Sequence, residues 1–304
     1  MGRPDQDQRG KQPALAETAQ THAFLGRKTR RGGWGEGAGW GLGWGRGGRR
    51  VDSVAEPLYL YGLVHHKGPL SLDAAGMQGR EVFSISYLDL AFLASASPRE
   101  KHEPLPEHVA CHNRVLEGVL AMGLTPLPVR FGTMAPPGKV SPEEKVLQLL
   151  RRHFGQFRRL LYSIEDRIEM RLSVCWRELP FEQVLAQDEG LRAFRDQVLA
   201  VAGGYAGQVE LGRRVAGVLD GLREARAQEM LARLRPLAAD MRRHPIRLEQ
   251  TVLDCAFLIP WENRAPFEAQ VEDLGLLYHE MDFRFIGPVP PFSFVELVIP
   301  WEEE

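Results

Sequence analysis

Residues 168–176 read Ile-Glu-Met-Arg-Leu-Ser-Val-Cys-Trp, and this stretch carries the clearest structural signal of the chain. Apolar side chains occupy every second position, and glutamate, arginine, serine and cysteine alternate with them. Successive side chains of a β-strand point to opposite faces of a sheet, whereas a helix repeats every ~3.6 residues. The alternation therefore predicts a strand with one face in a core and the other face turned to polar surroundings.

The elements that follow this strand predict the sheet to which it belongs. We expect a helical insertion over about 180–243, a strand over 252–259, a helix over 266–278 and a final strand over 283–287, which Gly287-Pro288 ends. That order is typical of a ferredoxin-like, split β-α-β sheet with its helices on one face. The insertion would enlarge this sheet by a long helical arm.

Within the insertion, apolar residues follow alternating steps of four and three, which is the spacing of a coiled-coil seam, although the run is too short to establish one. These residues are Leu211, Val215, Val218, Leu222 and Ala225. We expect a second helix to run to about Arg243 and to break at Pro245, with Pro236 kinking or restarting it. The glycines of 203–207 are expected to form a hinge between helices.

The chain before residue 166 shows a related order of elements. Aromatic and β-branched residues predict its strands, and helical spacing and capping residues predict its helices. In chain order we expect strands over 58–64 and 81–85, a third strand or buried turn over 87–94, a helix over 104–122 that Gly123 ends, a short strand over 127–132 and a helix that begins at Ser141-Pro142.

Length and composition favour a chain of two α+β domains. The chain has 304 residues, which is more than one compact domain holds, and its 44% hydrophobic and 26% charged residues are typical of folded globular proteins. We expect an N-terminal domain over 57–165 and a C-terminal domain over 166–304, both with ferredoxin-like character. Charged residues interrupt every apolar run before the ~18 residues that a membrane span needs. The three cysteines are few and far apart, which argues against a disulfide scaffold.

Residues 1–52 differ from the rest of the chain, because glycine recurs among arginines and tryptophans from Gly26 to Gly48. Such a stretch has no continuous apolar face, so we expect a disordered basic tail. Arginine and stacked tryptophan could bind RNA, and an incidental extension is the alternative that we favour. The tail does not decide the function.

Residue patterns typical of catalysis and metal binding are incomplete in this sequence. His108 and His112 have the spacing of two metal ligands on a helix, but Val109 stands where a hydrolytic site needs glutamate, and no third ligand is near in sequence. Nucleophile and phosphate-loop motifs are also missing. We therefore expect no enzymatic activity, no cofactor and no metal.

Two clusters of residues have a composition that solubility alone does not explain. In the first, Arg130 lies between apolar residues and before Phe131-Gly132, which predicts a guanidinium that bonds loop carbonyls or a carboxylate. In the second, Gly287-Pro288-Val289-Pro290-Pro291-Phe292-Ser293-Phe294-Val295, the prolines predict an extended segment that ends a sheet and lays two phenylalanines on an apolar face.

Together with Tyr59-Leu60-Tyr61-Gly62-Leu63-Val64, Leu211-Gly212-Arg213-Arg214 and Cys255-Ala256-Phe257-Leu258-Ile259, these clusters resemble the GvpL/GvpF family of gas vesicle proteins from residue 57 onward. Phe292 stands where the family usually has tyrosine, and Cys255 where small or polar residues are common. The family pattern has no segment that corresponds to the tail over residues 1–52.

The resemblance implies a non-enzymatic accessory protein of gas vesicle assembly, located in the gas vesicle or the cytoplasm. Its partners would be the small hydrophobic shell protein and other gas vesicle proteins, with no membrane and no small-molecule substrate. An RNA-binding protein that uses the tail and an RRM-like sheet is the alternative, but no RNP1-like strand is present. The resemblance marks as structural or partner-contact residues Tyr61, Gly62, Arg130, Phe131, Gly132, Gly212, Arg213, Gly287, Pro288, Pro290, Pro291, Phe292 and Phe294.

Overall fold

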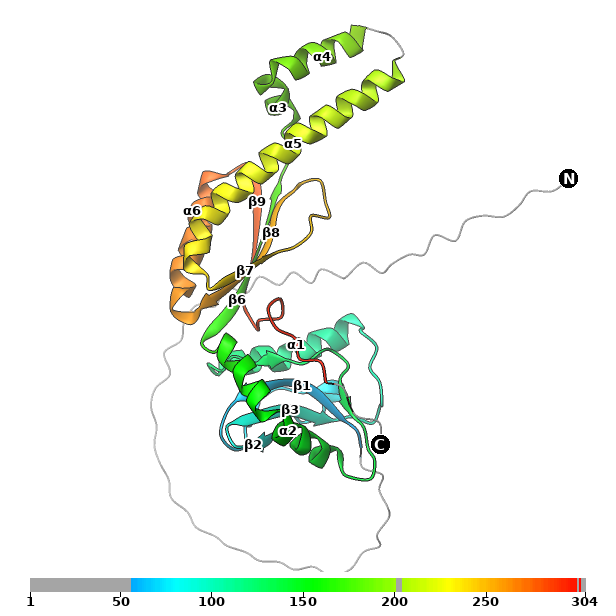
Figure 1. Cartoon of the computed structure of the whole chain (residues 1–304), viewed down its shortest axis with the longest axis vertical. Helices are drawn as coiled ribbons and strands as arrows, with labels where there is room; N and C mark the ends of the chain where they lie inside the picture. Colours follow the sequence, from blue (N-terminus) through cyan, green and yellow to red (C-terminus); the bar gives the residue numbers. More distant parts are fainter. Residues whose placement is uncertain (1–55, 201–203, 300, 302–304) are drawn as a thin grey trace, which may run out of the picture.

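A computed structural model of the chain describes residues 56–200, 204–299 and 301. It shows a mixed α/β fold with two antiparallel sheets, one in each half of the described chain. A helical arm projects beyond the second sheet, and the C-terminal segment lies between the two sheets (Figure 1). The expected tail over 1–52 lies outside the described residues.

The first sheet has the strand order β2-β3-β1-β4, and a further short strand, β5, also pairs with β1. A crossover that contains only the short helix η1 joins β1 to β2, which then forms a hairpin with β3. The elements are β1 (Leu58–His65), η1 (Met77–Gly79), β2 (Phe83–Tyr87), β3 (Leu90–Ala96), β4 (Leu127–Pro128) and β5 (Met134–Ala135).

Two helices cover the two faces of the first sheet. Helix α1 (Pro106–Ala121) ends before Gly123, which has a φ of +83°, and α2 (Pro142–Ile164) begins at Ser141, whose side chain accepts a hydrogen bond from the Glu144 amide. Both ends are as the sequence predicts, because glycine tolerates a positive φ and serine caps a helix N-terminus. The central strand β1 is therefore buried on both faces.

The second sheet has the order β7-β8-β6-β9, and all its neighbouring strands are antiparallel. Relative to the chain, this is the same order as in the first sheet: second, third, first and fourth strand. Helices α5 (Tyr205–Leu234) and α6 cover one face and form the larger hydrophobic core with it. The elements are β6 (Arg167–Trp176), β7 (Asp240–Arg243), β8 (Thr251–Pro260), η3 (Trp261–Asn263), α6 (Arg264–Leu277) and β9 (Met281–Val289).

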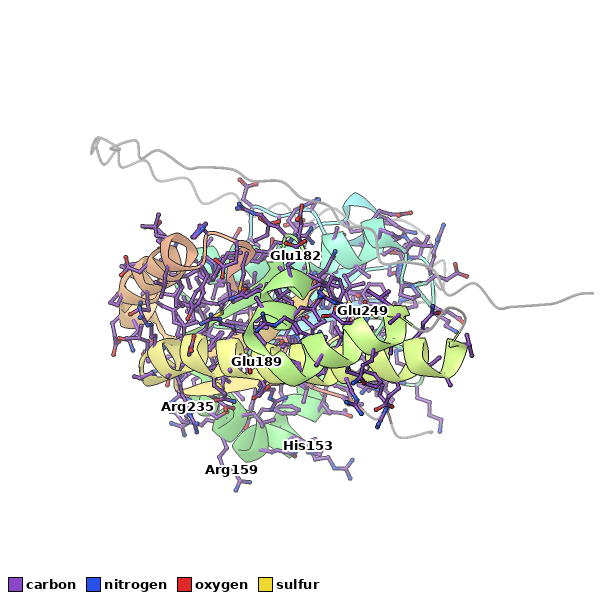
Figure 2. All side chains as sticks on the ribbon, turned by 90° about the horizontal axis from the view of Figure 1, so that it is seen from above. His153, Arg159, Glu182, Glu189, Arg235 and Glu249 are labelled. Carbon is purple, nitrogen blue, oxygen red and sulfur yellow. The ribbon has the colours of Figure 1, made fainter. Side chains whose placement is uncertain are left out.

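The arm consists of α3 (Phe181–Gln187), α4 (Glu189–Ala200) and the first half of α5 (Tyr205–Leu234). Seen from above, α5 runs across the width of the molecule (Figure 2). The apolar seam that the sequence shows packs here, with Leu211, Val215 and Val218 against the buried Val184 and Leu191. The expected hinge begins among residues outside the described part, and α5 follows directly after Gly204.

Three predictions of secondary structure are wrong. The helical insertion does not reach Arg243: α5 ends at Leu234, η2 (Arg235–Leu237) follows, and residues 240–243 form strand β7. Pro236, expected to kink or restart the helix, lies in the first turn of the short η2 where the α-helix ends, and the chain then pairs with β8. The strand expected over 127–132 is only two residues long, and β9 continues past Gly287-Pro288 to Val289, where an edge strand tolerates proline. No described helix combines the length and apolar character that a bilayer crossing requires.

Candidate functional site

Residues 290–299, which we call the C-terminal strap, contact both sheets. The strap leaves the end of β9, passes between the sheets and ends against the first sheet (Figure 1). Most residues of the two sequence clusters meet along it. This strap and its contacts form the candidate functional site.

Main-chain hydrogen bonds fasten the strap to the first sheet. The Leu297 amide donates to the Pro128 carbonyl at 2.8 Å, and the Arg130 amide donates to the Leu297 carbonyl at 3.0 Å. Val129 and Leu297 form a parallel β-bridge. The side chains of Leu297 and Ile299 are buried in the core between the first sheet and α2. The strap thus extends the first sheet next to β4.

Arg130 holds the strap from the side. Its Nε and Nη2 donate to Glu296 Oε2 at 3.2 Å and 2.9 Å. Of the two partners that the sequence leaves open, a loop carbonyl or a carboxylate, the guanidinium uses the carboxylate. Both side chains are about half exposed, so solvent screens this pair and its contribution to stability is small.

A buried tyrosine and histidine position the loop around Arg130. The Gly132 amide donates to Tyr59 Oη at 3.2 Å, and Tyr59 Oη lies 2.9 Å from His112 Nδ1. Burial lowers the pKa of His112 to about 4, so the imidazole is neutral at pH 7. A neutral imidazole has one donor and one acceptor, and the ring uses them on Tyr59 and on the Val129 backbone. Gly132 has a φ of +82°, a conformation that glycine adopts without strain.

The strap places two phenylalanines in two different apolar environments. Phe292 packs against the cluster between the first sheet and α1, which also contains Phe131. Phe294 packs on Ala256 and Leu258 of β8 in the second sheet. The amides of Phe294 and Val295 both donate to the Pro291 carbonyl, and this turn separates the two rings. One short turn therefore joins both halves of the molecule through apolar contacts.

A buried carboxylate anchors the turn to the second sheet. Glu169, on the face of β6 opposite the helices, is fully buried. Its two oxygens accept hydrogen bonds from the Ser293 amide at 2.6 Å, from Ser293 Oγ at 2.8 Å and from Arg171 Nε at 2.5 Å. A buried carboxylate is costly unless it is paired and hydrogen-bonded, and these three donors satisfy that requirement.

Arg242 closes the turn from the edge of the second sheet. Its Nη1 and Nη2 donate to the carbonyls of Ser293 at 2.6 Å and Phe294 at 3.1 Å, and its guanidinium lies 5.4 Å from the centre of the Phe294 ring. Such stacking of a guanidinium on an aromatic ring is attractive. Strand β7, which the sequence did not predict, thus supplies one of the contacts that hold the strap.

Glycines allow close approach at two marked positions. A Cβ at Gly62 would lie 2.7 Å from Leu116 Cδ2, next to the irregularity in the pairing of β1 with β3. A Cβ at Gly287 would lie 2.5 Å from Met170 Sδ and 3.0 Å from the Glu169 carbonyl, and Gly287 has a φ of +150°. Tyr61, next to Gly62, is buried; burial raises its pKa to about 12, and its hydroxyl bonds Ser95 and accepts from the Met77 amide. A larger residue at either glycine would displace its neighbours.

The structure brings together most of the marked residues, and separates two. Gly212 and Arg213 lie on the arm, far along α5 from the strap, and Arg213 pairs with Glu210 of the same helix. The residues at or next to the strap are Arg130, Phe131, Gly132, Gly287, Pro288, Pro290, Pro291, Phe292 and Phe294, and Tyr61 and Gly62 belong to the first-sheet core beside them.

Sequence reasoning missed the partners of these residues. Glu169 and Arg171 belong to the polar half of the alternating strand, which predicts a polar environment but not a buried carboxylate. Glu296 and Arg242 carried no signal of their own, and Tyr59 was noted only as part of the aromatic strand over 58–64. Ser293, inside the proline-rich cluster, was the available clue, because a serine between two apolar rings needs a polar partner when it is buried.

The polar groups in and around the strap bond other groups of this chain. His112 bonds Tyr59, whereas His108 Nδ1 faces the Glu103 carbonyl at 2.9 Å, so the pair with metal-ligand spacing serves two different contacts. Among the described residues, no group of three or more His, Cys, Asp or Glu is placed to hold a metal ion. The three cysteines, all within the described residues, are free thiols. The arrangement fastens two sheets to one another.

Comparison with known proteins gives a consistent result. A family model described as "Gas vesicle synthesis protein GvpL/GvpF" matches residues 57–296. Gas vesicle protein F of Nostoc sp. (strain PCC 7120) is 27% identical over 247 residues, which cover 80% of this chain and 100% of that protein. The matched region contains the described sheets, the arm and most of the strap.

Solved structures show the same architecture. The crystal structure of the gas vesicle protein GvpF from Anabaena sp. PCC7120 superimposes with a TM-score of 0.70 at 26% identity, covering 80% of this chain and 99% of that one. The crystal structure of GvpF from Microcystis aeruginosa gives a TM-score of 0.64 at 23% identity, covering 79% and 99%. The fold described above is therefore shared with these proteins.

Proposed function

Since this chain belongs to the GvpL/GvpF family of gas vesicle proteins, we propose that it is an accessory protein of gas vesicle assembly that binds the small shell protein and other gas vesicle proteins. The observation that carries this proposal is the match over nearly the whole described chain, in sequence and in fold, with gas vesicle proteins F. We further propose that it acts by docking, without catalysis, in the gas vesicle or the cytoplasm.

A physical requirement of assembly supports this role. A shell subunit that exposes an apolar face before it polymerises would aggregate, so an assembly factor has to cover that face reversibly. The chain has exposed apolar side chains on its projecting arm, among them Leu199, Tyr205 and Val209. These side chains are available for such a contact.

The strap supports a rigid two-part body for this docking. Because Phe292 and Phe294 enter opposite apolar environments and Glu169 holds the turn between them, the strap restrains the two sheets relative to each other. A restrained body presents a partner surface without an ordering cost on binding. We interpret the marked residues of the strap as structural rather than as partner contacts.

We also propose a ferredoxin-like plan for both sheets and a domain boundary at residues 165–166. The common strand order supports the plan, with the helix of the first crossover reduced to η1 in the first sheet and enlarged to the arm in the second. The apolar spacing of α5 against α3 and α4 supports coiled-coil-like packing in the arm. The domains would be 57–165 and 166–304.

The RNA-binding alternative receives no support. It depends on residues 1–52, which lie outside the described residues, and the similarities found are to gas vesicle proteins. We do not carry it further.

Sedimentation with purified shell protein tests the proposed function. Full-length chain is mixed with the shell protein of its own gas vesicle gene cluster after dilution from denaturant, and an unrelated acidic protein of similar size serves as the control. We expect this chain alone to keep shell protein in the supernatant and to elute with it. Equal aggregation in both mixtures, with no joint elution, would contradict the proposal.

A further inference from the structure

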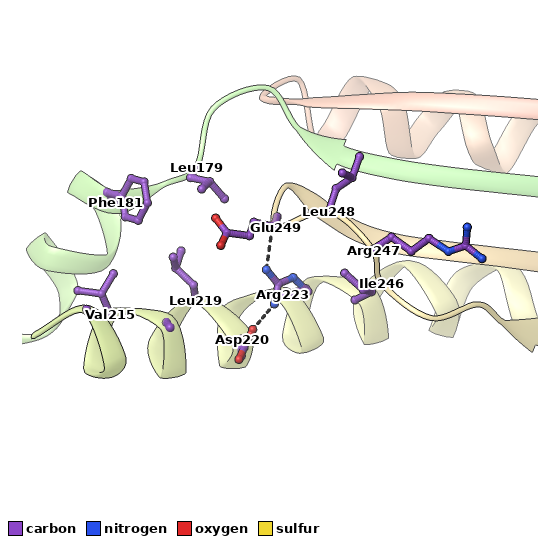
Figure 3. A pocket seen from close by; sticks show the side chains of 12 residues that line it. Leu179, Phe181, Val215, Leu219, Asp220, Arg223, Ile246, Arg247, Leu248 and Glu249 are labelled. Atoms are coloured by element: carbon purple, nitrogen blue, oxygen red, sulfur yellow. Dashed lines mark hydrogen bonds and ion pairs between the residues drawn. The ribbon is translucent and has the colours of Figure 1, made fainter. Parts of the chain in front are cut away.

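A groove of about 490 Å³ lies where the arm leaves the second sheet (Figure 3). Helix α5 forms its floor, the segment 179–181 that leads from β6 into α3 forms one wall, and the loop 244–250 between β7 and β8 forms the other. We call this hollow the arm groove. It is separate from the strap.

The walls of the arm groove are apolar and open to solvent. Leu179, Val215 and Leu219 line its inner part, and Phe181, Ile246 and Leu248 stand at its rim with exposures of 45%, 42% and 65%. Scattered exposed apolar residues are normal, but several that converge on one hollow mark a contact surface.

The floor of the arm groove is made of small residues. Gly212 and Ala216 lie four residues apart on α5, so they occupy the same face of the helix. Apart from its chain neighbours and the backbone of its own helix, no atom of the described chain lies within 4 Å of the position that a Cβ would take at Gly212, so packing inside the described chain does not require glycine. Glycine is unfavourable in a helix interior, and small residues let the backbone of a second helix approach closely.

One carboxylate in the arm groove has no basic partner among the described residues. The Glu249 side chain points into the groove between Leu179 and Leu219 (Figure 3). Arg223 is nearby, but its Nε donates to the Thr251 carbonyl at 2.9 Å, its Nη2 to the Glu249 carbonyl at 2.7 Å, and its Nη1 pairs with Asp220. The Arg223 guanidinium is thus committed to other acceptors. Arg247 also lines the groove, but its side chain extends away from Glu249 (Figure 3). The part of the groove between Leu179 and Leu219 therefore keeps the negative charge of Glu249.

We propose that the arm groove binds an amphipathic helix of the shell protein that carries a lysine or arginine within its apolar stripe. Charge complementarity determines this choice: the basic group pairs with Glu249 while the apolar stripe lies against Leu219, Leu248 and the small floor. The inference rests on the proposed function for the identity of the partner. It adds the surface and the chemistry of recognition.

A peptide array tests the chemistry of the partner. Overlapping 18-residue peptides that cover the shell protein are immobilised, and labelled full-length chain is applied. We expect binding to be confined to peptides with a helical apolar stripe that contains Lys or Arg, and replacement of that residue by Glu to weaken binding at least tenfold. Binding that does not depend on the basic residue would overturn the assignment to Glu249.

Charge reversal in the chain tests the surface. Glu249→Lys should weaken binding to the selected peptide at least tenfold, and should restore it toward the peptide in which Lys or Arg is replaced by Glu. Glu272→Lys is the matched control, because Glu272 is exposed on α6 away from the groove. Equal losses in both variants, or no rescue by the reversed peptide, would contradict the proposed contact.

Filling the floor separates a blocked groove from a damaged fold. Gly212→Leu places a side chain in the groove and improves helix propensity, so we expect a tenfold or greater loss of binding with unchanged or raised thermal stability. Gly217→Leu makes the same change in the same helix, where the glycine also has open space but does not line the groove. Binding that survives Gly212→Leu would overturn the proposal.

Three results separate this inference from the proposed function. Shell protein that binds wild-type chain and both groove variants equally would leave the function standing and reject the groove. Shell protein that does not bind wild-type chain would reject both. Dimers of the wild-type chain that Gly212→Leu abolishes, measured by light scattering, would assign the groove to a second copy instead.

Discussion

The two sheets share one strand order but are covered differently. In the first sheet, α1 and α2 lie on opposite faces, and seven of the eight residues of β1 are buried. In the second sheet, α5 and α6 share one face; along β6 the side chains on that face are buried, and those on the other face are half-buried except Glu169, which the strap covers. The open face of the second sheet is where the strap docks. The comparison shows that the same order of strands can serve as a two-sided core or as a one-sided platform that accepts a segment of chain.

The contrast has a cause in the connections. In the first sheet, β1 and β2 are joined by a loop that contains only η1, so one face of the sheet is left for α1 to cover. In the second sheet, the long insertion between β6 and β7 returns through α5, which packs on the same face as α6. On the other face of the second sheet no helix of the described chain holds the strap; Glu169, which accepts three hydrogen bonds from Ser293 and Arg171, holds it there. Four measurements sharpen or break this comparison, in order of expected effect.

The largest effect should come from the two-sided core. Phe92 on β3 is fully buried and meets Phe157 of α2 edge to face, so Phe92→Ala should lower the free energy of unfolding by about 3–5 kcal/mol. Ser173→Ala, on the open face of β6, should change it by less than about 0.5 kcal/mol. Urea denaturation measures both. Similar losses of unfolding free energy in the two variants would contradict the difference in coverage between the first sheet and the open face of the second.

Acid should weaken the first sheet through His112. Its pKa of about 4 in the folded chain lies below the ordinary 6.5, so between these values the unfolded chain binds a proton that the folded chain does not. Stability is therefore lost as the pH falls from 6.5 to 4, by about 3 kcal/mol in total. Denaturation at pH 7.0 and 4.5 should show a clearly smaller loss in His112→Gln than in the wild type; part of the loss remains because burial also lowers the pKa of His102.

The control for the acid effect is His279→Gln, because His279 is an exposed residue beside β9. This variant should keep the wild-type pH dependence. If His112→Gln keeps it as well, the buried imidazole is not the group that responds to acid.

Loss of the strap anchor should have an intermediate effect. Glu169→Ala removes the acceptor of Ser293 and Arg171 and should cost about 2 kcal/mol, because a buried amide is left without a partner while the half-exposed Arg171 regains water. It should also speed hydrogen exchange at Ser293, measured by mass spectrometry. Ser173→Ala, on the same face but beyond the strap contacts, should leave that exchange unchanged; equal exchange in both would contradict the anchor.

The smallest effect should come from the exposed pair. Arg130→Ala removes the contact with Glu296 and should cost at most about 1 kcal/mol, because both side chains are half exposed and screened by water. Thermal melting in low and high salt measures it, and salt should reduce the difference. A loss as large as that of Glu169→Ala would mean that the strap is held from the first sheet rather than the second.

Local patterns predicted the elements that local chemistry stabilises. Alternation at 168–176, the cap at Ser141 and the positive φ at Gly123 all depend on neighbouring residues, and the structure confirms each. Strand β7 was missed because four residues give too short a pattern and because its pairing with β8 decides it. For the same reason β4 is shorter than its apolar run suggested.

The residues of the candidate site also fall into two groups: those that the sequence could mark and those that it could not. Arg130, Gly132 and the proline-rich segment could be marked from the sequence because glycine, proline and a guanidinium between apolar residues have few other uses. Glu169 could not, since a glutamate on the polar side of a strand usually faces water.

The sequence by itself determined the periodicities, the caps, the breaks and the family to which the chain belongs, because each depends on residues within a few positions or on an ordered set of motifs. Only the tertiary structure decided that the polar side of β6 is buried under Ser293, that β7 supplies Arg242 and that Glu249 projects into an apolar groove. Burial and partner choice depend on segments far apart in the chain, 124 residues for Glu169 with Ser293 and 51 for Arg242 with Ser293, and no local pattern encodes which of them meet.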